Sequence, residues 1–310
     1  MSARALRSLS RSISWIPTGK PQRTLAKEAS VSGIGLHSGA SSRVRLLPAM
    51  AGEGRYFVSR DAKTKTRVQA TVGNCVDSVL STALSNGGVQ VHTVEHLLSA
   101  LEALGVDNCR IEIDGGNEIP LLDGSSKGWV ELVQSAGLCI ATDDEGLERE
   151  RLVPKLLEPM HLHRDDSFIV AVPSTETCIS CGIDFPKVPA IGSQWLSFTM
   201  NEDKYTKEIA PSRTFCIYEE VQKLLNAGLI KGGSSENAIV CSIKDGWLNP
   251  PLRFHDEPCR HKILDMIGDF SLLAESGNQG VPIAHILAYK AGHSLHTAFV
   301  RCLLGDMNFE

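Results

Sequence analysis

The stretch CRHKILDMIGDFSLLAESG, residues 259–277, is the part of the sequence that says most about the fold. At 100° per residue its apolar side chains gather on one face, which predicts an amphipathic helix over 259–276. His261, Asp265 and Asp269 form a second stripe at spacing i, i+4, i+8. An imidazole and a carboxylate one turn apart can coordinate one divalent cation, although a plain His–Asp contact on a helix surface would have the same spacing.

The stretch VHTVEHLLSAL, residues 91–101, predicts a second helix, because its leucines recur at helical spacing and Gly105 provides a stop. His92, Glu95 and His96 match H-x-x-E-H, the pattern in which inverted zinc peptidases bind metal through both histidines. A catalytic zinc keeps three protein ligands and leaves one position open. These two histidines together with the pair on the other helix would close that position, so one of the four ligands must be excluded.

Strands precede helices twice along the chain. Alternating residues and Gly-bearing turns predict antiparallel strands in each half, and further helices are expected at 127–137, 216–228 and 296–304. The charged stretch ATDDEGLERER indicates a linker at 141–152. We therefore expect an α+β fold of two similar sandwich domains, 22–140 and 153–310, with helices packed between the sheets.

Composition limits the class of protein. A chain of 310 residues can hold two domains, and its formal charge of −5 gives no basic footprint for nucleic acid. No apolar run is long enough to span a bilayer. Nine scattered cysteines in mostly apolar segments are typical of reduced thiols in a reducing compartment. We expect a monomer with a small-molecule site, no nucleic-acid partner and no transmembrane segment.

The N-terminus differs from the rest of the chain. Residues 1–27 contain six Lys or Arg, five Ser and no Asp or Glu. This profile is typical of an organellar transit peptide and lacks the continuous apolar core of a secretory signal. The sequence predicts a transit peptide at 1–21 and a location in the mitochondrial matrix, with the plastid as the alternative; a merely disordered basic tail would have the same composition.

Five motifs in register carry a resemblance to a known family. They are EHLLSALEALGVDN, EIPLLDGSS, SRTF, RHKILDMIGD and YKAGH, with GIGLHSG near their start. In this order they resemble UDP-3-O-acyl-N-acetylglucosamine deacetylase, the zinc amidase that commits an acylated UDP-sugar to lipid A synthesis. The resemblance runs from residue 22 to 305.

The resemblance implies a metal site and decides between the histidines. It implies Zn²⁺, with Fe²⁺ as an alternative, bound by His96, His261 and Asp265 and open toward the interface between the two domains. His92 is then the histidine that does not bind, and family members usually carry a small hydroxylic residue at its position.

The resemblance also implies a division of roles in acetamide hydrolysis, which yields UDP-3-O-acyl-glucosamine and acetate. Glu95 would act as general base, and Thr214 would donate a hydrogen bond to the developing oxyanion. His293 would protonate the leaving amine, and Asp269 would hold this histidine in its charged form.

Substrate-binding positions are implied as well. Lys262 and Lys290 match positions that face the sugar and diphosphate, and Phe185 and Phe215 match aromatic positions near the nucleotide. Ile217 replaces a Phe of bacterial members, so the nucleotide pocket is expected to differ there.

An insert expected at 186–212 matches the family element that lines a tunnel for the acyl chain. Seven of its apolar residues fit that use, although an ordinary small core uses the same types: Val188, Ile191, Trp195, Leu196, Phe198, Met200 and Ile209.

Two other functions fit parts of the same sequence. A zinc peptidase would use His92, Glu95 and His96, and a non-catalytic homologue would bind a nucleotide or lipid without turnover. The presence together of metal ligands, base, acid and oxyanion donor argues against the second. Cys178 and Cys181 have C-x-x-C spacing, but residues three apart face opposite sides of a strand, so no metal or redox site is expected there.

Overall fold

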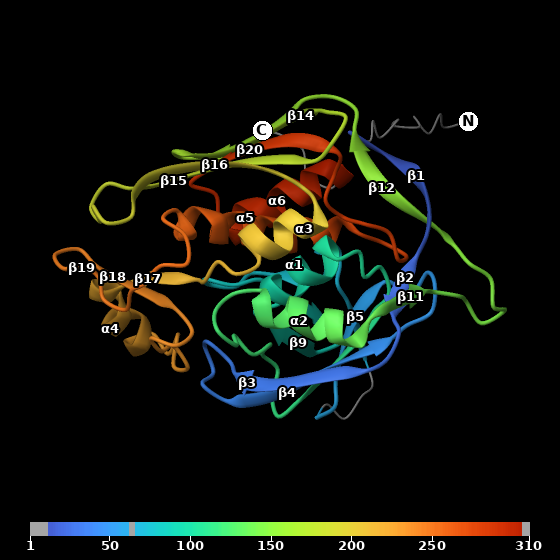
Figure 1. Ribbon diagram of the computed structural model, residues 1–310, viewed down its shortest axis with the longest axis horizontal. Helices are drawn as coiled ribbons and strands as arrows, with labels where there is room; N and C mark the ends of the chain where they lie inside the picture. Colours follow the sequence, from blue (N-terminus) through green and yellow to red (C-terminus); the bar gives the residue numbers. More distant parts are fainter. Residues whose placement is uncertain (1–11, 62–65, 306–310) are drawn as a thin grey trace, which may run out of the picture.

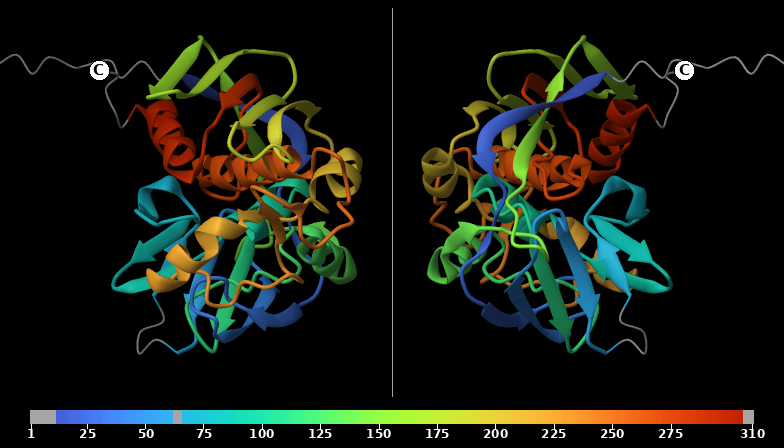
Figure 2. Two further views of the ribbon diagram at one scale, coloured as in Figure 1. Left: turned by 90° about the vertical axis from the view of Figure 1, so that its left-hand side faces the viewer. Right: turned by 90° about the vertical axis from the view of Figure 1, so that its right-hand side faces the viewer.

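The computed structural model describes residues 12–61 and 66–305. Two five-stranded sheets form its outer layers, and helices lie between them (Figure 1). Side views show the sheet of the N-terminal half on one side of the helices and that of the C-terminal half on the other (Figure 2). The predicted α+β class, with helices packed between sheets, is confirmed. Within the described ranges no helix combines the length and apolarity that a membrane span needs.

The sheet of the N-terminal half has the strand order β3-β4-β10-β5-β6. Its strands are β3 (Ala29–Ile34), β4 (Ser41–Pro48), β5 (Arg55–Ser59), β6 (Arg67–Gln69) and β10 (Cys109–Asp114). The central strand β10 is antiparallel to β4 but parallel to β5. A parallel neighbour requires a long crossover connection, and here that crossover contains a helix.

The sheet of the C-terminal half repeats this plan with the order β13-β14-β20-β15-β16. Its strands are β13 (Met160–Arg164), β14 (Ser167–Pro173), β15 (Cys178–Phe185), β16 (Gly192–Thr199) and β20 (Ala284–Tyr289). Again the last strand is central, antiparallel to β14 and parallel to β15. The two halves are therefore similar, as predicted. The prediction of antiparallel strands is confirmed for most neighbours. It is wrong for β5 with β10 and for β15 with β20, because a helical crossover inserts the last strand of each half beside the third.

Four helices fill the space between the sheets. They are α1 (Glu95–Ala103), α2 (Lys127–Ala136), α5 (Glu257–Phe270) and α6 (His293–Leu304). Helices were predicted at all four places, although α6 begins three residues before the predicted start. A 3-10 turn, Ser271–Leu273, continues α5. Their apolar faces join a single core that also takes in side chains from both sheets.

Helices α1 and α5 cross in direct contact at Gly268. A Cβ atom at this position would lie 2.1 Å from the carbonyl oxygen of Glu95, so only glycine permits the crossing. The contact places the first turn of α1 against the last turn of α5. Polar residues of the two halves therefore meet inside the molecule.

A strap of two strands joins the halves. Strand β1 (Ile13–Pro21) pairs antiparallel with β12 (Glu150–Leu156) along one side of the molecule (Figure 1). Ile13 is 4% exposed and belongs to the core. A leader ending at residue 21 would remove this paired strand, and a linker over 141–152 would end inside β12. Residues 1–11 of the predicted transit peptide lie outside the described residues.

Smaller elements flank the sandwich. Strands β2 (Arg23–Leu25) and β11 (Leu138–Ile140) pair with each other. The 3-10 turn Val72–Asn74 leads into a small sheet of β7 (Cys75–Val76), β8 (Ala83–Asn86) and β9 (Val89–His92), which precedes α1. Strands β17 (Phe215–Ile217), β18 (Ile239–Ser242) and β19 (Gly246–Trp247) form another, which stands out from the layers with α4 (Tyr218–Asn226) (Figure 1).

The segment predicted as an insert at 186–212 is part of the sandwich. It forms β16, the edge strand of the C-terminal sheet, followed by α3 (Glu202–Lys204) and a π-helical turn, Tyr205–Ile209. Four of the seven apolar residues expected to line a tunnel are buried in the main core instead: Val188, Ile191, Phe198 and Ile209. An acyl-chain-binding role of this segment stays a prediction. The element that projects is the small sheet β17–β19 with α4.

Candidate active site

Three buried side chains from two helices converge where α1 meets α5. His96 lies in the first turn of α1, while His261 and Asp265 lie one turn apart on α5. Oδ1 of Asp265 is 3.3 Å from Nε2 of His261 and 3.5 Å from Nε2 of His96. The two rings meet edge to face, and the three ligand-type atoms lie within 4.8 Å of one another. The group, called the His–His–Asp cluster below, has the donor types and the spread of a divalent-cation site.

Hydrogen bonding prepares the cluster for a cation. Nδ1 of His261 lies 3.0 Å from the backbone carbonyl of Ser212, which makes Nδ1 the protonated nitrogen and leaves the lone pair on Nε2 facing Asp265. Oδ1 of Asp265 is buried and accepts no hydrogen bond within the described part of the chain. A buried carboxylate oxygen without a donor is costly unless a cation satisfies it. The residues present therefore fit a bound metal.

Electrostatics keep the ligands in their binding forms. Burial lowers the pKa of His261 to about 3, against the opposing effect of the Asp265 charge, so the imidazole is neutral at pH 7. Burial alone would raise the pKa of Asp265, but His261, when protonated at acid pH, and the charge of Lys262 outweigh it and hold the pKa well below its usual range. Neutral imidazole and ionised carboxylate are the forms that bind metal.

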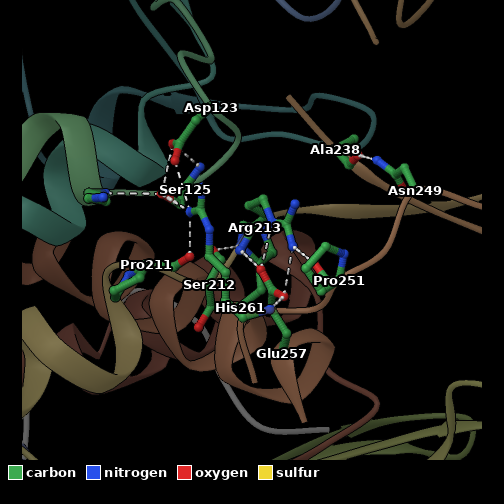
Figure 3. A network of polar contacts seen from close by, with 12 residues as sticks. Asp123, Ser125, Pro211, Ser212, Arg213, Ala238, Asn249, Pro251, Glu257 and His261 are labelled. Atoms are coloured by element: carbon green, nitrogen blue, oxygen red, sulfur yellow. Dashed lines mark hydrogen bonds and ion pairs between the residues drawn. The ribbon is translucent and has the colours of Figure 1, made fainter. Parts of the chain in front are cut away.

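A salt-bridge network behind the cluster fixes the chain segment that holds His261 (Figure 3). The carboxylate of Glu257, fully buried at the start of α5, accepts from the backbone N–H and the guanidinium of Arg213. It also accepts from the backbone N–H of Arg253, whose side chain reaches Asp123. This network ties the residues on either side of Arg213, Ser212 and Thr214, to the helix that carries two members of the cluster.

Glu95 lies beside the cluster, buried and oriented. Its Oε2 accepts a hydrogen bond of 3.0 Å from the backbone N–H of Thr82. Burial raises the pKa of Glu95, although the neighbouring histidines His293 and His96 oppose the rise. A carboxylate with a raised pKa is a better proton acceptor at neutral pH than an exposed one. Glu95 and the cluster line a cavity of about 40 Å³ together with Leu36, Leu80, Thr93, Leu121, Thr214, Lys262 and His293.

Asp269 organises a second group one turn further along α5. Its Oδ2 lies 2.8 Å from Nδ1 of both His293 and His296, and its Oδ1 accepts from the hydroxyl of Thr82 at 2.5 Å. Burial lowers the pKa of His293, but the Asp269 charge and hydrogen bond outweigh it and raise the pKa to about 9. His293 is therefore charged at pH 7 and forms part of the cavity wall. His296 shows the opposite behaviour, because burial dominates and lowers its pKa.

Three of the four expected substrate-binding residues are linked by contacts, and Lys290 pairs with other side chains. Lys262 lines the cavity and donates to Oδ2 of Asp265 at 2.9 Å, while its Nζ lies 5.8 Å from the centre of the Phe215 ring. Phe185 and Phe215 contact each other edge to face with ring centres 5.5 Å apart. Lys290 instead pairs with Asp166 at 2.5 Å and lies 3.8 Å from Asp184.

His92 does not join the cluster. It ends strand β9, where its backbone N–H donates to the carbonyl of Asn117, and it pairs with Ala83 across the small sheet. The three-residue groups with metal-binding geometry among the described residues do not include it. The H-x-x-E-H pattern requires both histidines on one helix. His92 lies in strand β9 and α1 begins only at Glu95, so His92 and His96 do not share a helix.

Three supporting residues were missed by sequence reasoning. His296 follows His293 by three positions on one helix, a spacing that could have indicated a shared partner. Thr82 and the Ser212 carbonyl left no signal, because their contacts with Asp269 and His261 span 187 and 49 residues.

Comparisons with known proteins agree with this geometry. The family model of UDP-3-O-acyl N-acetylglycosamine deacetylase matches residues 22–305. The chain is 50% identical over 301 residues to probable UDP-3-O-acyl-N-acetylglucosamine deacetylase 1, mitochondrial, of Arabidopsis thaliana, covering 95% of this chain and 91% of the relative. It is 49% identical over 291 residues to the UDP-3-O-acyl-N-acetylglucosamine deacetylase of Trichormus variabilis, covering 93% and 99%. Both lie far above the identity at which a shared fold is in doubt, and the chain therefore belongs to the UDP-3-O-acyl N-acetylglycosamine deacetylase family.

Proposed function

We propose that this protein is a metal-dependent amidase that hydrolyses the acetamide of UDP-3-O-acyl-N-acetylglucosamine. The products are UDP-3-O-acyl-glucosamine and acetate, and the reaction is the committed step of lipid A biosynthesis. The relatives named above are called deacetylases of this substrate. The observation that carries the proposal is the convergence of His96, His261 and Asp265 on one point from two halves of the chain.

The proposed metal ligands are the three residues of the His–His–Asp cluster. Two imidazoles and one carboxylate suit Zn²⁺ and equally suit Fe²⁺, and three protein ligands leave a position open for water or substrate. When bound, such a cation makes a water molecule more acidic and polarises an amide carbonyl. Zn²⁺ is the proposed metal, and Fe²⁺ is the alternative.

The side chains around the cavity divide the proton transfers between them. Glu95 takes the proton from the attacking water, because its raised pKa and the Thr82 hydrogen bond make it an oriented base. Thr214, on the cavity wall, donates a hydrogen bond from its hydroxyl to the developing oxyanion. His293, charged and held by Asp269, gives its proton to the leaving amine.

Cationic and aromatic groups near the cavity bind the rest of the substrate in this proposal. Lys262 and Lys290 supply positive charge for the sugar and diphosphate, while Phe185 and Phe215 flank the nucleotide. Lys262 lies between the cluster and Phe215, which supports a position between the reacting amide and the nucleotide. Ile217 lies in the projecting strand β17 next to Phe215. The acylated UDP-sugar is the only partner required, and we propose a monomer.

We propose that the protein acts in an organelle. The Arabidopsis relatives are named mitochondrial, and the first residues of this chain are basic, rich in serine and free of acidic residues. The mitochondrial matrix is the proposed location, with the plastid as the alternative. Because β1 begins at Ile13, we place the end of the leader before Ser12 rather than at residue 21. Imaging of a C-terminal fluorescent fusion with organelle markers, and mass spectrometry of the mature N-terminus, test both statements.

The function is tested with purified protein starting at Ser12 and UDP-3-O-acyl-N-acetylglucosamine. Free amine and acetate should appear in equal amounts, disappear after chelation and return with added Zn²⁺ or Fe²⁺. Glu95→Ala should lower kcat by about 10²-fold to 10⁴-fold, the range for loss of a general base. Glu112→Gln, a buried carboxylate held by arginines on the far side of β10, is the matched control. Turnover that persists after complete metal removal would falsify the proposal.

A further inference from the structure

Glu118 is a buried carboxylate next to the candidate active site that the mechanism above does not use. It is 4% exposed and makes no ion pair among the described residues. Its Oε1 accepts from the backbone N–H of His37 at 2.8 Å and from the hydroxyl of Thr93 at 3.1 Å. Its Oε2 accepts from the backbone N–H of Ser38 at 2.8 Å. The carboxylate is thus satisfied entirely by neutral donors from two separate segments.

The first of these segments is the loop of residues 35–39. A Cβ atom on Gly35 would lie 2.4 Å from Oε2 of Glu118, so glycine allows the loop to wrap closely around the carboxylate. Leu36 of this loop lines the cavity at the His–His–Asp cluster, and its carbonyl accepts from the backbone N–H of Gly232. Glu118 therefore fixes one wall of the cavity.

The second segment leads directly into helix α1. Thr93 has φ of 59°, a left-handed conformation that costs a β-branched residue energy. It stands two residues before Glu95 and three before His96, and its buried side chain lines the cavity. A residue in such a conformation persists only where its surroundings hold it. Backbone hydrogen bonds fix its neighbours His92 and Val94, and its own hydroxyl donates to Glu118.

We infer that Glu118 is a positioning residue that sets the start of helix α1, and with it Glu95 and His96, by holding Thr93 in its left-handed conformation. This inference rests on the proposed function for its kinetic consequences. A misplacement of catalytic groups by about 1 Å can cost about 10²-fold in rate, so a contact of this kind can matter without touching substrate. Glu118 also couples α1 to the wall formed by Leu36, since one carboxylate serves both segments.

The test compares Glu118→Gln and Thr93→Ala with the control Glu112→Gln. In Glu118→Gln one carboxylate oxygen becomes an NH₂ group, which then faces a backbone N–H or the Thr93 hydroxyl instead of accepting from it. In Thr93→Ala the hydroxyl is removed. We expect kcat to fall by about 10-fold to 100-fold in both variants, with KM and metal stoichiometry unchanged. The double variant should be no slower than Glu118→Gln alone, because both changes break the same contact. Thr93→Ser keeps the hydroxyl and should restore kcat.

A second readout does not depend on activity. Amide hydrogen exchange of peptides covering 91–101 should become faster in Glu118→Gln and Thr93→Ala but not in Glu112→Gln. Faster exchange at the start of α1 supports the inference even if the wild-type chain releases no acetate, an outcome that would contradict the proposed function alone. Unchanged exchange, or fully additive losses of kcat in the double variant, would overturn the role of Glu118. If Glu118→Gln does not fold, the comparison of Thr93→Ala with Thr93→Ser decides.

Discussion

The two halves of the molecule share one strand order but contribute differently to the candidate site. In each half four strands come first, a helix crosses over, the fifth strand enters the centre of the sheet and a last helix follows. The crossover helix of the N-terminal half, α1, brings polar side chains to the site only in its first turn, at Glu95 and His96. Its counterpart α5 brings a stripe through its middle, at His261, Asp265 and Asp269. The same scaffold thus supports one helix that reaches the site end-on and another that lies along it.

This difference follows from how the two helices cross. Gly268 lies against the backbone of Glu95, so the start of α1 touches α5 between Asp265 and Asp269. The last helix of each half, α2 or α6, also differs in whether it reaches the site directly. His293 opens α6 and lines the cavity, whereas the start of α2 supports the site indirectly through the hydroxyl of Ser126, which donates to the carbonyl of His96. In the proposed mechanism the C-terminal half supplies the acid His293, its partner Asp269 and two metal ligands, and the N-terminal half supplies the base and one ligand.

The largest effect is expected from breaking the crossing itself. Gly268→Ala places a methyl group against a backbone carbonyl that cannot yield, so the free energy of unfolding should fall by about 3 kcal/mol. Activity should be lost because α1 and α5 separate. Gly128→Ala is the matched control in a helix of the other half, where the added Cβ meets only the end of the Leu122 side chain. Thermal unfolding and acetate release measure both, and equal stability of the two variants would contradict the account of the crossing.

The next effect tests the proton-transfer groups of the C-terminal half. Asp269→Asn should lower kcat/KM by about 10²-fold to 10⁴-fold, because His293 loses the charge that keeps it protonated. In the wild type, kcat/KM should decline at alkaline pH as His293 loses its proton. The Asp269 carboxylate raises the pKa of His293 to about 9, and a bound dication lowers it again, so the midpoint of this decline should lie at or below about pH 9.

In Asp269→Asn this alkaline decline should move to lower pH, because the charge that raises the pKa is gone. Asp256→Asn, which changes a buried carboxylate paired with Arg260 at the start of α5, is the control. A pH profile of Asp269→Asn that superimposes on the wild type would show that His293 is held by other groups.

A smaller effect is expected from removing the strap between the halves. A chain starting at Gln22 lacks β1, loses the core contact of Ile13 and leaves β12 unpaired. The free energy of unfolding should be lower than that of a chain starting at Ser12 by about 2 kcal/mol, the contribution of one buried aliphatic side chain. Denaturant unfolding of the two chains measures the difference. Identical midpoints would mean that β1 contributes nothing to joining the halves.

The smallest effect is expected at His92. Because its strand position keeps it out of the His–His–Asp cluster, His92→Ala should bind metal with unchanged stoichiometry and keep kcat within about twofold, the range of a surface substitution. Metal analysis of the purified variant gives the answer. Loss of the metal would instead support a peptidase-like site built from His92 and His96.

Much of the site could be predicted because helices α1 and α5 carry strong periodic patterns. The spacing of His261, Asp265 and Asp269 places them on one face of any helix, and this local geometry does not depend on the rest of the fold. The parallel strands were missed because alternation within a strand says nothing about the direction of its neighbour. The strand at 13–21 was missed because it follows a basic, serine-rich stretch that resembles a targeting segment, while its pairing partner β12 lies far away along the chain, from Ile13 to Leu156 and from Pro21 to Glu150.

The sequence by itself determined the helices, the polar stripe on α5, the family and the set of residues able to bind a cation. The residues alone left open which histidine of the N-terminal half faces that stripe, and the family resemblance implied His96. Only the tertiary structure decided how the two helices meet, through the start of α1 at Glu95 and the approach allowed by Gly268. The physical reason is that helical periodicity fixes the relative directions of side chains within one element. The distance between elements depends instead on packing contacts whose partners lie far apart along the chain.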